Sequence, residues 1–242
     1  MVLSILPGIS FVGRESLSPI DVIMTIDYEL FTQTLKFYLM KHPAIVDEDL
    51  IRYWFLCIHN TNPIIEVAYK PNKKQHNYLK INPAHQQIFT SKKACADLYY
   101  ADTDTVFEFK YHRKTDYSNN CTTTKVGTAF KDINRLSILE NREKYFIYVF
   151  DDQMAGYYSN NSNKSKDFPQ YYFDLDCIKT GYTFNINKTT APSQYSITFR
   201  ENAFLGFLKS AQSFNSFGYC MTVEFAGKIP DTKFNMIVYK IA

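Results

Sequence analysis

Residues 95–112 read CADLYYADTDTVFEFKYH, two apolar segments around a short polar one. Apolar, aromatic and β-branched residues fill its two halves, and such residues are typical of strands. Residues 101–104, which read ADTD, separate the halves and have the composition of a tight turn. The stretch therefore predicts a β-hairpin.

The register of this hairpin follows from the position of its turn. If the turn is centred on residues 102 and 103, Tyr100 lies opposite Thr105. Counting back from that pair places Asp97 opposite Glu108, with the two side chains in contact. Side chains alternate between the faces of a strand, so Lys110 shares the face of Glu108. Three aromatic side chains are expected to point the other way, into apolar packing: Phe107, Phe109 and Tyr111.

Two carboxylates held side by side repel unless a proton, a cation or wide exposure to solvent offsets their charges. Mg²⁺ or Mn²⁺ would supply that cation, because both metals prefer oxygen ligands and take one or two carboxylates with carbonyls, water and phosphate. Lys110 could then orient or activate a metal-bound water against a phosphodiester. The alternative is a solvated strand face, since Glu-x-Lys occurs by chance in many proteins.

With Asp97 followed by the run Glu108-Phe109-Lys110, the hairpin resembles the PD-(D/E)xK nuclease superfamily, which has the restriction-endonuclease-like fold. The resemblance covers roughly residues 24–158. It implies a mixed central sheet flanked by helices. It also implies that Asp97, Glu108 and the Phe109 carbonyl bind the metal, and that Lys110 positions the attacking water. Ala96 stands where the named motif has proline, which removes no ligand.

The same family has an acidic helix before the first strand. A helix with apolar positions at Leu50, Trp54, Cys57 and Ile58 is predicted after residues 46–50. Residues 64–69, which read IIEVAY, then predict a strand. The resemblance makes Glu48, in the first turn of this helix, the residue that completes or orients the metal site. Acidic residues in a first turn also complement the helix dipole, so a purely structural role stands beside that one. Glu66 is a weaker alternative ligand.

Downstream of the hairpin, residues 122–139 predict an amphipathic helix with Ala129, Ile133 and Leu136 on one face. Residues 145–150, which read YFIYVF, are apolar on both faces and predict a central, covered strand. A strand, a helix and a buried strand in this order suggest a right-handed crossover. Lys125, near the start of the helix, could reach a phosphate, and a solvated lysine is the alternative.

The insertion at residues 70–93 is the most basic part of the chain, and no acidic residue occurs in it. Its lysines alternate with histidine and aromatic residues, a combination that can follow a phosphate backbone and stack on bases. We expect Lys73, Lys74, Lys92 and Lys93 to contact nucleic acid. A solvated loop is the alternative reading, and RNA in place of DNA stays open.

Composition bounds these expectations. A chain of 242 residues that is 45% hydrophobic can bury a large core, in one domain or two smaller ones. The formal charge of +3 is too small to identify a nucleic-acid partner by itself. Five scattered cysteines without a C-x-x-C pair argue against a disulfide scaffold or zinc finger and fit a reducing cytoplasm. The sequence shows no signal peptide, membrane span or glycine-rich nucleotide motif.

Composition also suggests how the chain is divided. Residues 1–23 are expected to form an arm, because an amphipathic pattern begins at Met24 with Ile26, Leu30, Phe37 and Tyr38. The polar residues 159–166 predict a linker or a long surface loop. Residues 167–242 predict an α+β or mostly β extension with several strands, the first at 171–178, and a helix at 203–214. This extension could lengthen the sheet, recognise substrate or form the interface of a homodimer.

Together these observations predict a cytoplasmic, Mg²⁺-dependent α/β nuclease that hydrolyses phosphodiester bonds, with DNA favoured as the substrate. Its expected catalytic residues are Glu48, Asp97, Glu108 and Lys110. One alternative is a non-catalytic nucleic-acid-binding or interaction module on the same fold. Another is an unrelated α/β interaction protein whose hairpin acids face solvent and point apart.

Overall fold

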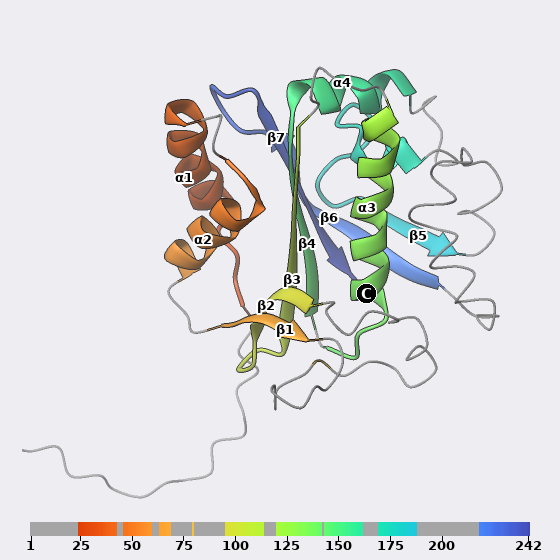
Figure 1. Cartoon of the computed structure of the whole chain (residues 1–242). Helices are drawn as coiled ribbons and strands as arrows, with labels where there is room; N and C mark the ends of the chain where they lie inside the picture. Colours follow the sequence, from red (N-terminus) through yellow and green to blue (C-terminus); the bar gives the residue numbers. More distant parts are fainter. Residues whose placement is uncertain are drawn as a thin grey trace, which may run out of the picture.

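One mixed sheet of seven strands organises the protein, in the order β1-β2-β3-β4-β7-β6-β5 (Figure 1). The computed structural model describes residues 24–42, 46–59, 63–68, 79, 95–113, 120–141, 143–161, 169–187 and 218–242. Across the sheet, the strands are β1 (Ile64–Ala68), β2 (Cys95–Tyr100), β3 (Thr105–His112), β4 (Glu143–Asp151), β7 (Phe234–Ile241), β6 (Gly218–Lys228) and β5 (Thr183–Asn187).

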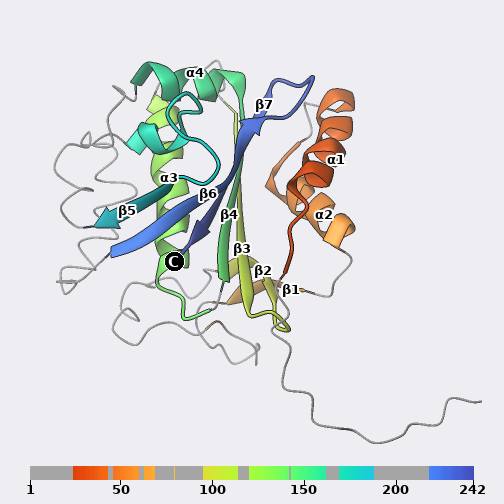
Figure 2. The ribbon, with the colours of Figure 1, turned by 180° about the vertical axis from the view of Figure 1, so that it is seen from behind.

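Helices cover both faces of this sheet, as Figures 1 and 2 show from opposite sides. Helices α1 (Tyr28–Lys41) and α2 (Glu48–His59) pack on one face, where they share an apolar core with β3, β4 and β7. Helices α3 (Asn120–Ser137) and α4 (Asp152–Asn161) and the short helix η2 (Pro169–Phe173) pack on the other. The fold is therefore α/β, as expected, with a layer of helices on each side of the sheet.

Strands β3 and β4 are the parallel pair of the described sheet, and α3 connects them. Every residue of β4 from Lys144 to Asp151 is buried, so the prediction of a central, covered strand is confirmed. The predicted helix face on α3 is confirmed as well, because Ala129, Ile133 and Leu136 are all fully buried. This pair forms the middle of the molecule.

The buried face predicted for α1 is wrong, and the one predicted for α2 is right in part. In α1, Leu30 and Phe37 are 46% and 51% exposed, and a stripe shifted along the helix is buried instead: Phe31, Leu35 and Leu39. In α2, Ile51 and Phe55 are fully buried, and the expected Cys57 is exposed. The other expected residues are partly buried against the same core: Leu50, Trp54 and Ile58. Both helices carry apolar residues around much of their circumference, so contact with the sheet, not spacing alone, selects the buried stripe.

The extension lies in the same sheet as the hairpin, because β7 pairs with β4 on one side and β6 on the other. Residues 171–178, which were expected to form a strand, instead form the end of η2 and a turn. There the Asp174 carboxylate accepts the Asp176 N–H at 3.0 Å, and the Cys177 N–H bonds the Asp174 carbonyl at 2.9 Å. Such local hydrogen bonds compete with strand pairing. The expected arm at 1–23 and helix at 203–214 lie outside the described residues, as does most of the 159–166 run.

Candidate active site

The β2–β3 hairpin has the register that its turn predicts. Tyr100 pairs with Thr105 and Leu98 pairs with Phe107. One step further along the same register, Asp97 is level with Glu108. The backbone pairs between β2 and β3 do not continue to this position. Here the Asp97 carboxylate instead accepts the N–H of Phe109 at 2.6 Å. A charged side chain thus serves as the hydrogen-bond acceptor for this part of β3.

A third acidic position lies in the same row. Pairs on either side of Glu66 join Ile65 to Leu98 and Val67 to Ala96, which places Glu66 level with Asp97 on the neighbouring strand. Glu66 has a φ of 54°, in the left-handed region that residues other than glycine seldom adopt. Acidic residues therefore occupy matching positions on three adjacent strands, at Glu66, Asp97 and Glu108.

The first turn of α2 meets the edge of β3 and brings Glu48 to this row. Asp47 caps the helix, because its carboxylate accepts the Leu50 N–H at 2.9 Å. Because Asp47 serves as the cap, the Glu48 carboxylate can bind residues of β3. Its Oε2 accepts from the Lys110 Nζ at 3.1 Å and from the Tyr111 N–H at 3.4 Å. A residue of α2 and a residue of β3 thus share one polar cluster.

Lys110 connects three elements. Besides Glu48, its Nζ lies 2.9 Å from the Asp132 carboxylate of α3, which also pairs with Arg135 at 3.1 Å. The Lys110 side chain is only 15% exposed. Burial alone would lower its pKa, but the carboxylates of Asp132 and Glu48 hold the pKa above its ordinary value. The Lys110 amine is therefore a protonated, well-fixed cation at neutral pH.

The carboxyl groups of the cluster have raised pKa values. Glu108 is 5% exposed on the face that packs against α3, and burial raises its pKa well above the ordinary value, with a further contribution from Asp97. Burial also raises the pKa of Asp97 to about 6, against the opposing effect of the Phe109 N–H. The pKa of Glu48 is raised for the same reason. Desolvated, mutually repelling carboxyl groups of this kind are common at functional sites.

Arg52 offsets part of this charge. It lies one turn after Glu48 on α2, and its guanidinium is 3.1 Å from the Asp97 carboxylate and 3.7 Å from that of Glu66. The same group pairs with Asp49 at 2.7 Å. Arg52 therefore ties the start of α2 to β1 and β2.

The donor atoms of this cluster fit a hard divalent cation, which prefers carboxylate and carbonyl oxygens. In the part of the chain that the structure describes, no three acidic, histidine or cysteine side chains are yet arranged around one point. The Asp97 carboxylate faces the Phe109 N–H and Arg52. Each oxygen of the Asp97 carboxylate thus already accepts one hydrogen bond within the protein.

The structure brings Glu48, Asp97, Glu108 and Lys110 into one cluster, and it adds residues that sequence reasoning missed. Arg52 could have been noticed from its i, i+4 spacing to Glu48. Asp132 could also have been noticed in the sequence, because it is an acidic residue directly beside the predicted buried face of α3. Arg135 follows it at i+3 and forms its second ion pair.

Of the lysines expected to contact nucleic acid, the structure describes Lys125 alone. Lys73, Lys74, Lys92 and Lys93 lie outside the described residues. Lys125 lies on α3, and its ammonium donates to the Arg113 carbonyl just past the end of β3. It is therefore held at the carboxyl end of β3 and forms none of the ion pairs of the cluster around Lys110.

None of the helices within the described ranges is long and apolar enough to cross a membrane. Comparisons of the whole chain with protein-family models, with curated proteins and with solved structures find no match.

Proposed function

We propose that this protein is a metal-dependent nuclease with a restriction-endonuclease-like core, and that DNA is its favoured substrate. One observation carries the proposal. Glu48 and Lys110, which are 62 positions apart in the chain, meet at 3.1 Å beside Asp97, whose carboxylate holds the backbone between Glu108 and Lys110. The side chains that the motif requires thus converge from α2, β2 and β3.

The order of the elements supports the same proposal. Helix α2, strand β1, the β2–β3 hairpin, helix α3 and the buried strand β4 follow one another along the chain. This is the order that the resemblance implies for the core of the family. The long basic insertion falls between β1 and β2, next to the proposed catalytic hairpin.

Each residue has a role in this proposal. Asp97, Glu108 and the Phe109 carbonyl would hold Mg²⁺ or Mn²⁺, and Glu48 would complete or orient the site. The bound ion would supply Lewis acidity and make water a better nucleophile. Because Asp132 and Glu48 keep Lys110 protonated, Lys110 cannot accept a proton. It would instead orient the attacking water and offset the charge that develops on the phosphate.

Calorimetric titration of Mn²⁺ tests the proposal, with cleavage of plasmid and single-stranded DNA scored on the same samples. Wild type is compared with Asp97→Asn, and Asp102→Asn in the exposed hairpin turn is the matched control. We expect wild type and the Asp102 variant to bind Mn²⁺ and cleave, and the Asp97 variant to do neither. Absence of Mn²⁺ binding by the wild type, even with DNA present, would overturn the proposal.

A second candidate is a non-catalytic binding module on the same fold, and the contact of Arg52 with Asp97 favours it. Arg52 and Lys110 already supply positive charge where a metal would bind. The variant Arg52→Met separates the two candidates. A nuclease should retain or gain Mn²⁺ affinity when Arg52 is removed, whereas a binding module should bind nucleic acid or protein without Mn²⁺ in both forms. The expected homodimer and cytoplasmic location stay predictions.

A further inference from the structure

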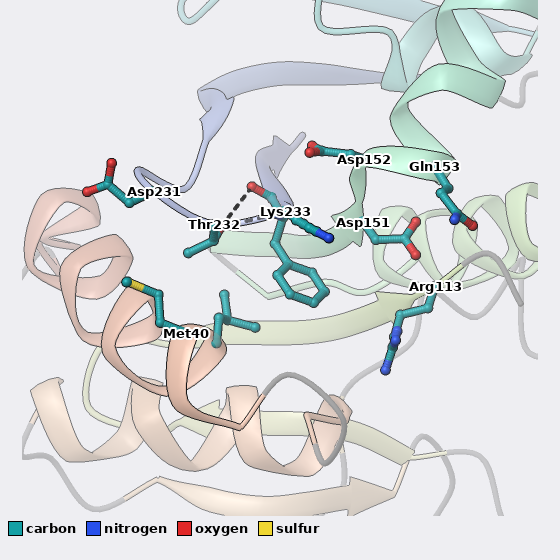
Figure 3. Close-up of a pocket in the computed structure, with 10 residues that line it drawn as sticks. Met40, Arg113, Asp151, Asp152, Gln153, Asp231, Thr232 and Lys233 are labelled. Atoms are coloured by element: carbon teal, nitrogen blue, oxygen red, sulfur yellow. Dashed lines mark hydrogen bonds between the residues drawn. The ribbon is translucent and has the colours of Figure 1, made fainter.

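A pocket of about 530 Å³, distinct from the cluster around Lys110, opens at the end of the sheet and is drawn in Figure 3. It shares no lining residue with that cluster. Its walls come from the end of α1, the residue after β3, the start of α4 and the turn between β6 and β7. Its volume lies within the range of roughly 300–1,000 Å³ that is typical of small-molecule sites.

The position of the pocket follows from the sheet topology. Strands β3 and β4 are parallel, so their carboxyl ends meet at one edge. Arg113 directly follows β3, and Asp151 is the last residue of β4. Both residues line the pocket. Ligands of open α/β sheets bind in crevices outside the carboxyl ends of parallel strands, where successive connections diverge.

One part of the pocket wall is apolar, with Leu39, Met40 and Phe234 among the lining residues. Leu39 and Phe234 are buried, whereas Met40 is 56% exposed and therefore available to a ligand. In Figure 3, Met40 lies on the side of the pocket opposite Gln153 and Arg113. An apolar surface thus faces a polar one.

The carboxylates that line the pocket already have partners within the protein. Asp152 accepts from Lys228 at 2.8 Å and from the Asn235 amide at 3.0 Å. Asp231 pairs with Lys36. The Asp151 carboxylate accepts the Met154 N–H at 2.8 Å and so caps α4. The two ion pairs offset the charges of Asp152 and Asp231. Asp151 keeps its negative charge, which stands against the two cations of the lining, Lys233 and Arg113.

Two polar side chains remain available. Among the described residues, neither Lys233 nor Gln153 makes a side-chain hydrogen bond or ion pair, and both are exposed. Figure 3 shows the Lys233 side chain directed toward the part of the pocket that carries Asp151, Gln153 and Arg113. The Lys233 ammonium and the Gln153 amide, together with the guanidinium of Arg113 that also interacts with Tyr111, therefore line a space whose other wall is apolar.

We propose that this pocket binds a small organic phosphate with an aromatic body, namely a mononucleotide. Its phosphate would pair with Lys233 and Arg113, and its base would lie against Met40 with its edge near the Gln153 amide. Lysine and arginine are the usual partners of phosphate, and an amide can both donate to and accept from a base edge. The nucleotide could be free or the phosphorylated end of a strand. This assignment does not depend on whether the cluster around Lys110 cleaves DNA.

Calorimetric titrations test the assignment, with EDTA present so that no divalent metal contributes. The ligands are dTMP, thymidine, inorganic phosphate and a 5′-phosphorylated oligothymidylate. Lys233→Met removes the cation, and Lys179→Met, at an exposed lysine outside the pocket, is the matched control. Circular dichroism checks that both variants, at exposed positions, keep the wild-type fold.

We expect dTMP to bind wild type and the Lys179 variant equally and the Lys233 variant about tenfold or more weakly, as loss of a charge-assisted hydrogen bond implies. Thymidine and phosphate should each bind more weakly than dTMP. Tighter binding of the oligonucleotide than of dTMP identifies a strand end, and the reverse identifies a free nucleotide. Absence of saturable dTMP binding, equal affinity in the Lys233 variant, or equal affinity for phosphate alone would overturn the assignment.

Discussion

At the residue scale, burial of Asp97 makes the protein less stable at neutral pH than in mild acid. The folded-state pKa of about 6 exceeds the ordinary value of 3.8, so between these values the folded protein binds this proton more tightly than the unfolded chain. The stability that this group contributes is therefore greatest near pH 4 and falls as the pH rises through 6. Integrated over that window, the loss amounts to at most about 3 kcal/mol.

The variant Asp97→Asn should remove the part of this pH dependence that Asp97 contributes and leave the part that comes from Glu48 and Glu108. The Asn carbonyl can still accept the Phe109 N–H but carries no charge to desolvate, so we expect the variant to be more stable than wild type at pH 7. Urea unfolding between pH 4 and pH 7 measures the difference, and Asp102→Asn should follow the wild-type curve. A variant less stable than wild type at pH 7 would mean that the ion pair with Arg52 outweighs the cost of burial.

Lys110 has the opposite effect on stability. The pKa of Lys110 is raised in the folded protein. Its contribution to the free energy of unfolding is therefore fully present below the unfolded-state pKa of about 10.4, and it is lost only in strong alkali. Lys110→Met leaves Asp132 and Glu48 partly buried without their shared cation, which should cost roughly 3 kcal/mol at pH 7. It should also abolish cleavage.

Lys110→Arg separates these two effects. Arginine keeps the charge, so the variant should unfold in urea close to wild type, but its larger planar group cannot occupy the position of Nζ. Single-turnover cleavage should therefore fall while stability is largely retained. Equal stability of the Met variant and wild type would contradict the assigned role of Lys110 in joining α2, β3 and α3.

At the element scale, the first turn of α2 is fastened to the edge of β3 through Glu48. We expect Glu48→Ala to destabilise the protein by about 1–2 kcal/mol and to accelerate exchange of the Tyr111 amide hydrogen, which Glu48 accepts. Glu29→Ala is the matched control, because Glu29 is also a first-turn acid, and among the described residues its carboxylate accepts from Gln33 of its own helix at 3.4 Å. Amide exchange followed by NMR would contradict this role if both variants left Tyr111 equally protected.

The elements also show how far the sequence alone could lead. The hairpin was predictable in register, because turn chemistry at residues 101–104 fixes which residues pair across β2 and β3. The buried stripe of α1 was not, since Leu30 and Phe37 are as apolar as the residues that the sheet actually covers. Asp132 was not predictable as a partner of Lys110 either, because only the packing of α3 over β3 brings the two together.

At the scale of the whole molecule, the sheet is assembled from both ends of the chain. Strand β7, from the C-terminal region, lies between β4 and β6 and pairs with β4 over seven residue pairs. Its Met236 and Val238 belong to the core beneath α1 and α2, whereas Ile237 and Tyr239 belong to the core beneath α3. Each layer of helices therefore depends on a strand that follows it by many residues in the chain.

A fragment ending at residue 166 should therefore fail to fold, although it contains the whole proposed nuclease core. Without β7, it would expose the backbone edge of β4 and apolar residues on both faces of the sheet, which favours aggregation. We expect the fragment alone to show no cooperative thermal transition by circular dichroism. Co-expression with residues 167–242 should restore one transition, as in the intact chain, because the second fragment supplies the missing strands. Cooperative unfolding of the first fragment by itself, with dispersed amide signals in NMR, would instead mean that the core is complete at β4 and that β7 only adds to it.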